Sequence, residues 1–173
     1  IRLASENGHA DVVRLLLGKP DVNPAAMQNY AIRFASKNGH ADVVQLLLEI
    51  PNVNPATMNN YAFRLASENG RADVVRLLLG RPDVNPAAMD NYAIGSASRN
   101  GRVDVVRLLL ERPDVDPAAM NNYAIKWASY NGHTDVVQLL LERPNVNPAA
   151  LDNDAIRLAS ENGHADVVRL LLG

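Results

Sequence analysis

Residues 4–17 read Ala-Ser-Glu-Asn-Gly-His-Ala-Asp-Val-Val-Arg-Leu-Leu-Leu, and residues 159–172 repeat this stretch without a change. The Asn-Gly pair within it returns every 31 residues, with its glycine at Gly8, Gly39, Gly70, Gly101, Gly132 and Gly163. Five units of 31 residues and 18 further residues make up the 173-residue chain. A fixed period of this length predicts a linear array of one supersecondary unit, in which neighbouring units bury each other's apolar sides.

Each unit is predicted to contain two helices. Residues 60–68 form the first, and the following Asn-Gly pair ends it because Gly accepts the left-handed conformation of a helix C-terminus. Residues 72–79 form a second, more apolar helix that Pro82 stops. The first helix of each repeat can begin near Asn91 and its equivalents, which is the start that we favour. Alternatively it can begin at Asn85-Pro86 and the equivalent pairs. The favoured start gives helix pairs over 1–18, 29–49, 60–80, 91–111, 122–142 and 153–173, within a single array over 1–173.

The stretch at 4–17 and 159–172, with the Asp-Val-Asn at 21–23 and 83–85, resembles the ankyrin repeat over the whole chain. The period is 31 rather than 33, and the first helix opens with Tyr-Ala-Ile-Arg in place of Thr-Pro-Leu-His. The resemblance implies an all-α, ankyrin-like solenoid of stacked helix–turn–helix repeats with protruding loops. It also implies a non-catalytic scaffold that binds another protein through its loop tips and the exposed edge of its first helices.

The composition argues against nucleic-acid and membrane binding. The chain has 17 Lys and Arg against 19 Asp and Glu, for a net charge of −2, so it lacks the basic surplus of nucleic-acid-binding domains. Its apolar runs are only a few residues long, far below the roughly 20 residues that span a bilayer. The start of the chain does not resemble a signal peptide, so we expect a cytoplasmic protein. The absence of Cys excludes disulfides and thiolate zinc sites.

The residues that recur in every unit indicate a scaffold rather than an active site. Ser5-class and Asp11-class residues, with the histidines, superficially supply a hydrolytic triad, but catalysis needs one constellation and not six copies. Arg71 and Arg102 replace His9-class residues in two units, and Arg is neither a base nor a metal ligand. We therefore expect no enzyme activity, metal or cofactor, and we interpret the histidines as structural groups near the interhelical turn.

The variable positions predict where a partner binds. Two columns four residues apart share a helix face and sum to four positive charges, which predicts a partner with an acidic surface; the alternative is a solvated charged face. The candidates on this stripe are Arg33, Lys37, Arg99 and Lys126. The expected loop-tip column contains Gln28, Asn59, Asp90, Asn121 and Asp152.

One unit departs most from the others in its aromatic content. Tyr130 stands in the exposed column, and Trp and Tyr are enriched at binding hot spots. Trp127 is a second candidate, although its column is otherwise mostly apolar and the small Ser96 in the preceding unit favours volume compensation in a packed core. Gly95, inside a predicted helix, marks either a soft seam or a close approach by a ligand.

The end units carry the full apolar pattern without a polar outer face. Ile1 lies inside the first helix, which predicts that the chain is a fragment of a longer array. The alternative is end-to-end self-association through the last unit, which would make a structural array. The residues expected at that contact are Val167, Val168, Leu171 and Leu172.

Overall fold

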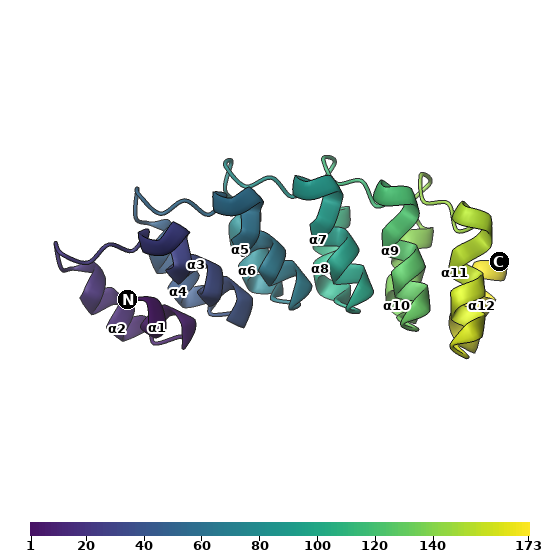
Figure 1. Ribbon diagram of the computed structural model, residues 1–173, viewed down its shortest axis with the longest axis horizontal. Helices are drawn as coiled ribbons and strands as arrows, with labels where there is room; N and C mark the ends of the chain where they lie inside the picture. The colour runs from purple at the N-terminus through teal and green to yellow at the C-terminus, as the bar shows by residue number, and fades with distance from the viewer. The chain divides into compact units, whose positions relative to one another are not determined.

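The computed structural model describes residues 1–173 and contains twelve helices and no strand, which confirms the all-α prediction. The chain forms two compact units, Ile1–Pro86 and Ala87–Gly173, which are described separately. Within each unit, helix pairs lie side by side, and the loops that join one pair to the next emerge on one side (Figure 1). The single array over 1–173 stays a prediction.

In the first unit the helices are α1 (Arg2–Glu6), α2 (Ala10–Leu17), α3 (Ala26–Asn38), α4 (Ala41–Leu48), α5 (Thr57–Glu68) and α6 (Ala72–Leu79). In the second unit they are α7 (Ala88–Arg99), α8 (Val103–Leu110), α9 (Ala119–Tyr130), α10 (Thr134–Leu141), α11 (Ala150–Glu161) and α12 (Ala165–Leu172). Odd-numbered helices are the first of each pair, and even-numbered helices are the second.

Two neighbouring valines in each second helix face opposite neighbours in the stack. In α2, which belongs to the first helix pair of its unit, Val12 is 45% exposed while Val13 is fully buried. In α12, the last helix pair of its unit, the pattern is reversed, with Val167 buried and Val168 half-buried. The first valine therefore packs toward the preceding pair and the second toward the following pair, which is why the sequence keeps both in every repeat.

The first helix of five pairs begins with one turn of left-handed helix, which the sequence analysis does not predict. In α3 this turn contains Met27, Gln28 and Asn29, with φ angles of 54°, 56° and 61°. The backbone N–H of Asn29 donates a hydrogen bond to the Ala25 carbonyl at 3.0 Å and so closes the turn, and the right-handed helix follows. The same geometry recurs at 58–60, 89–91, 120–122 and 151–153.

The Asn that ends each left-handed turn ties its repeat to the next one. The side-chain Oδ1 of Asn29 accepts a hydrogen bond from the Asn54 backbone N–H at 2.8 Å, and its Nδ2 donates to Thr57 Oγ1 at 2.9 Å. Equivalent bonds to the backbone join Asn60 to Asn85, Asn91 to Asp116, and Asn122 to Asn147. Asn153 belongs to the last repeat and is exposed.

The His9 column forms a second connection between repeats. Nε2 of His164 lies 3.0 Å from the Tyr130 carbonyl oxygen, and His40 and His133 make the same contact with the preceding first helix. Arg71 replaces His in its repeat and donates from Nε to the Lys37 carbonyl at 3.0 Å. Because both side chains supply an N–H donor at the same place, His and Arg are interchangeable here. This confirms the interpretation of the histidines as structural groups near the turn.

Candidate functional site

The predicted basic residues of the first unit differ in how much of their charge is available. Arg33 is half-buried, and its guanidinium donates to the Met27 carbonyl of its own left-handed turn at 3.0 Å. It also lies 6.0 Å from the ring centroid of Tyr30 and 5.6 Å from that of Tyr61, within cation–π range of both. Arg33 therefore stabilises the turn and the repeat stack, and only part of its charge faces solvent.

Lys37 is the exposed cation among the first-unit candidates. Its Nζ lies 5.9 Å from the Phe34 ring centroid and forms no ion pair within the chain. Tyr30 stacks on Phe34 at 4.2 Å and donates its hydroxyl to Glu6 at 2.7 Å. This hydrogen bond, followed by partial burial, raises the pKa of Tyr30 above its usual range.

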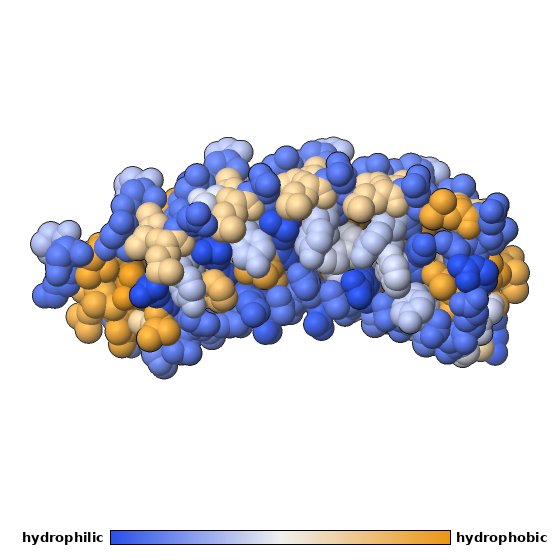
Figure 2. Space-filling view, viewed as in Figure 1, coloured by the Kyte–Doolittle hydropathy of each residue, from blue (hydrophilic) through white to orange (hydrophobic).

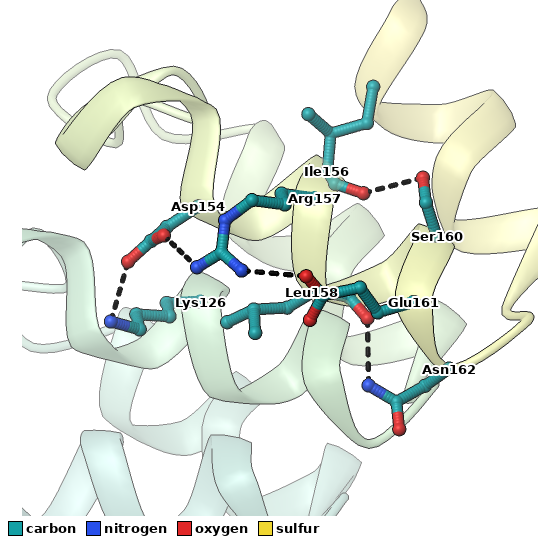
Figure 3. Close-up of polar contacts among 8 residues, drawn as sticks. All are labelled: Lys126, Asp154, Ile156, Arg157, Leu158, Ser160, Glu161 and Asn162. Carbon is teal, nitrogen blue, oxygen red and sulfur yellow. Dashed lines mark hydrogen bonds and ion pairs between the residues drawn. The ribbon is translucent and has the colours of Figure 1, made fainter.

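Lys126, in the second unit, is engaged in a network of charged side chains (Figure 3). Its Nζ lies 2.7 Å from Asp154, which also binds Arg157 at 2.5 Å, and Arg157 binds Glu161 at 2.8 Å. The hydrogen bonds from Lys126 and then from Arg157 lower the pKa of Asp154, while Asp154 and Glu161 raise that of Arg157. The charge of Lys126 is therefore largely compensated.

We expect Asp154→Asn to reduce the loss of stability in acid. The pKa of Asp154 is lower in the folded chain than in the unfolded one, so its stabilisation is present above the unfolded-state pKa. That stabilisation is lost as the pH falls through the folded-state pKa. Between about pH 5 and about pH 2, the free energy of unfolding of the wild type should therefore fall more steeply than that of the variant.

Urea denaturation at a series of pH values measures this difference. The control is Asp152→Asn, which removes a neighbouring exposed carboxylate that makes no ion pair and should follow the wild type. Parallel pH profiles for Asp154→Asn and the wild type would show that the network contributes nothing.

Three aromatic side chains lie along successive turns of α9 in the second unit. The half-buried Trp127 ring lies 5.3 Å from Tyr130 in an edge-to-face arrangement and 5.8 Å from Tyr123. The Arg99 guanidinium of α7 lies 5.4 Å from the Trp127 ring centroid. We call Arg99, Tyr123, Trp127 and Tyr130 the α9 cluster. Trp127 is therefore not fully enclosed in the core, and its compensation with Ser96 stays a prediction.

The structure explains Gly95 by a contact within the chain. A Cβ atom at this position would lie 3.0 Å from Cδ1 of Tyr123, which is tighter than nine in ten real Cβ contacts, so the ring would have to shift by a few tenths of an ångström. Glycine therefore gives the Tyr123 ring room beside α7. In the first unit, the residue equivalent to Gly95 is Arg33, whose guanidinium lies beside the Tyr61 ring, the equivalent of the Tyr123 ring. The group close to the Gly95 backbone within the chain is thus the Tyr123 ring of the following repeat.

The expected loop-tip residues lie at the middle of the left-handed turns rather than in the loops. Gln28, Asn59, Asp90, Asn121 and Asp152 are all exposed at these positions. The residue before each is a large, exposed apolar side chain, which the sequence analysis did not single out: Met27, Met58, Met89, Met120 and Leu151, between 46% and 59% exposed. In each unit, Figure 2 shows apolar patches separated by hydrophilic residues. The signal was available, since a large apolar residue directly before a polar pair recurs at these five positions.

No group of three or more His, Asp or Glu side chains lies close enough together to hold a metal ion. None of the twelve helices has the length and apolar character needed to span a membrane.

A comparison with protein-family models matches ankyrin repeats, in three copies, to residues 1–90 and 94–173. A search of curated proteins finds no match. Ankyrin repeats are generally protein–protein interaction modules, and the family is typically non-catalytic. The match spans nearly all of both units and agrees with the stacked helix pairs, so the chain belongs to the ankyrin repeat family.

Proposed function

We propose that the protein binds a partner protein through the exposed face of its first helices, with the α9 cluster at the centre of the contact. The observation that carries this proposal is the partial exposure of a Trp, a Tyr and an Arg in one place. Tyr130 is 38% exposed, and Trp127 is half-buried beside the exposed Arg99. These three residue types are the ones most enriched at the energetic centres of protein interfaces.

The exposed charges of the first helices favour a partner with an acidic surface. Arg33 and Lys126 are engaged inside the chain, so Lys37 is the exposed candidate cation of the first unit and Arg99 that of the second, each considered by itself. Exposed methionines at the left-handed turns add flexible apolar contact area, which suits an interface. The mid-turn residues, such as Gln28 and Asn121, offer polar groups at its edge.

Capture of a partner from an extract of the source cells tests this proposal. The immobilised wild-type chain should retain a discrete protein, and the double variant Arg99→Gln, Tyr130→Ala should retain at least about tenfold less, as expected when hot-spot side chains are removed. The matched control is Gln138→Ala, which changes an exposed residue of α10 and should retain as much as the wild type. Equal retention by all three proteins would overturn the proposal.

A second candidate function is end-to-end assembly of identical chains into a structural array. At one end Leu3, Val12 and Leu15 are 72%, 45% and 73% exposed, and at the other Leu172 is 72% exposed. The surface at each end is equivalent to one side of the contact that neighbouring repeats make inside a unit. The two end surfaces of two copies are therefore complementary. The fully buried Val167 has no part in this surface, because it packs toward the preceding pair; Val168, Leu171 and Leu172 remain candidates.

Sedimentation velocity over a hundredfold range of concentration separates the two candidates. A partner-binding module stays monomeric throughout, whereas an end-to-end array gives species that grow with concentration. If growth is observed, Leu172→Glu should suppress it by placing a charge in the apolar contact.

A further inference from the structure

We propose that the α9 cluster is a binding site for an acidic side chain, Asp or Glu, that stands beside a large apolar residue in a peptide segment of the partner. This inference rests on the proposed protein-binding function and specifies the chemistry of one contact. It concerns only residues of the second unit.

The cluster presents donors that the chain does not use. The Arg99 guanidinium is exposed and forms neither an ion pair nor a hydrogen bond within the chain, and it lies over the Trp127 ring at 5.4 Å. The Tyr130 hydroxyl and the Trp127 indole N–H also lack partners within the chain, and Tyr130 is exposed. Stacking on a ring restrains a guanidinium but leaves its in-plane N–H groups free for a carboxylate.

The acceptors near the cluster are already occupied. Asp154 binds both Lys126 and Arg157, and Glu161 binds Arg157. The Arg99 carbonyl accepts hydrogen bonds from Asn131 and His133. The neighbouring carboxylates are therefore compensated by cations, and the positive charge of Arg99 is left for an anionic group from outside.

The aromatic rings indicate what lies beside that carboxylate. Trp127 and Tyr130 meet edge to face at 5.3 Å and together form a partly exposed apolar surface next to Arg99. Contact with this surface buries apolar area of the incoming segment, so a large apolar neighbour binds more tightly than a polar one.

The acidic group is the side chain of an internal residue rather than the C-terminal carboxylate of a partner. Chain termini are typically captured by successive backbone N–H groups arranged as a nest. At this site the donors are side chains of α7 and α9, and the backbone N–H groups around Trp127 are used within α9. The Arg99 guanidinium can donate two parallel N–H bonds, and this geometry matches one carboxylate on a flexible side chain.

Fluorescence titration tests the inference directly, because Trp127 is the only Trp in the chain. The probe is the blocked peptide acetyl-Gly-Leu-Glu-Leu-Gly-amide, and its control has Gln in place of Glu. We expect a saturable change in Trp127 emission with the Glu peptide and about tenfold weaker binding of the Gln peptide, the effect of losing one charge-assisted pair. A third peptide, with Gln and a free C-terminal carboxylate, should bind like the Gln peptide.

Variants of Arg99 identify the group responsible. Arg99→Gln should bind the Glu and Gln peptides equally weakly. The affinity of Arg99→Lys for the Glu peptide should lie between those of Arg99→Gln and the wild type, because Lys keeps the charge but lacks the pair of parallel N–H donors. Arg107→Gln, which removes an exposed cation of α8 in the same unit, should leave binding unchanged.

Four results would overturn the inference. They are no saturable change, equal binding of the Glu and Gln peptides to the wild type, wild-type affinity in Arg99→Gln, and tight binding of the third peptide, which would show that the site takes chain termini. These failures are distinguishable from failure of the proposed function. In each case, if the wild type still captures a protein and Tyr130→Ala captures less of it, the protein-binding proposal stands.

Discussion

Gly132→Ala is expected to lower the free energy of unfolding by about 2–5 kcal/mol, whereas the same change at Gly163 should cost only about 1–2 kcal/mol. Both glycines have positive φ angles, 73° and 75°, so alanine pays a similar backbone penalty at each. At Gly132 the new Cβ would also lie 2.5 Å from Nδ1 of His164, whereas at Gly163 nothing lies within 4 Å. The difference between the variants therefore measures how closely successive repeats approach.

Chemical denaturation followed by Trp127 emission measures both variants in the same unit. A double-mutant cycle with His164→Ala checks the cause, because removing the imidazole should abolish the additional penalty of Gly132→Ala. Equal destabilisation by Gly132→Ala and Gly163→Ala would contradict the close contact between the turn and the next repeat.

Asn29→Ala is expected to be the second most damaging change, at about 2–4 kcal/mol, against about 1 kcal/mol for Asn153→Ala. Both residues end a left-handed turn, with φ angles of 61° and 65°, a conformation that Asn adopts more readily than Ala. Of the two residues, only Asn29 forms side-chain hydrogen bonds to a following repeat, with Asn54 and Thr57. Its side chain is 7% exposed, so its removal also leaves these partners poorly hydrated.

Urea denaturation followed by far-ultraviolet circular dichroism tests this prediction, since the first unit contains no Trp. Asn29→Asp serves as a second control: it keeps the acceptor for the Asn54 amide and loses the donor to Thr57, so it should lie between the wild type and the alanine variant. If Asn29→Ala and Asn153→Ala are equally destabilising, the side-chain bonds between repeats do not stabilise the stack.

The stacked helix pairs could be predicted because their signals are local and repeated. The Asn-Gly pair ends each first helix, and the apolar runs mark each second helix, so these signals and the period together predict the repeated helix pair. The structural role of the histidines followed from the same logic, since Arg71 stands in for His without any change of fold.

The left-handed turns could not be predicted, because Asn and Asp adopt positive φ as single residues, whereas three successive non-glycine residues with positive φ are rare. Each such residue costs about 1–2 kcal/mol in isolation, and Met27 has no polar side chain that would compensate. The turn is stabilised by contacts that a local pattern does not contain, such as the Asn29 bonds to the following repeat.

The candidate site was predicted in part. The variable columns of the sequence predict Trp127, Tyr130 and Arg99 as candidates, and the structure brings them together on α7 and α9. The same columns predict Lys126 as an exposed charge, whereas Asp154, from the following repeat, binds it at 2.7 Å. The signal was present, because Asp154 replaces the Tyr of that column, but pairing across 28 residues becomes visible only once the repeats are stacked.

Photo-crosslinking from position 130 tests the central claim, that a partner protein contacts the first-helix face at the α9 cluster. A photoreactive benzoylphenylalanine replaces Tyr130 in one protein and the exposed Gln138 of α10 in the other. The expected result is a covalent adduct with the captured protein from position 130 and none from position 138. An adduct from position 138 alone, or equal adducts from both positions, would show that the partner contacts another surface.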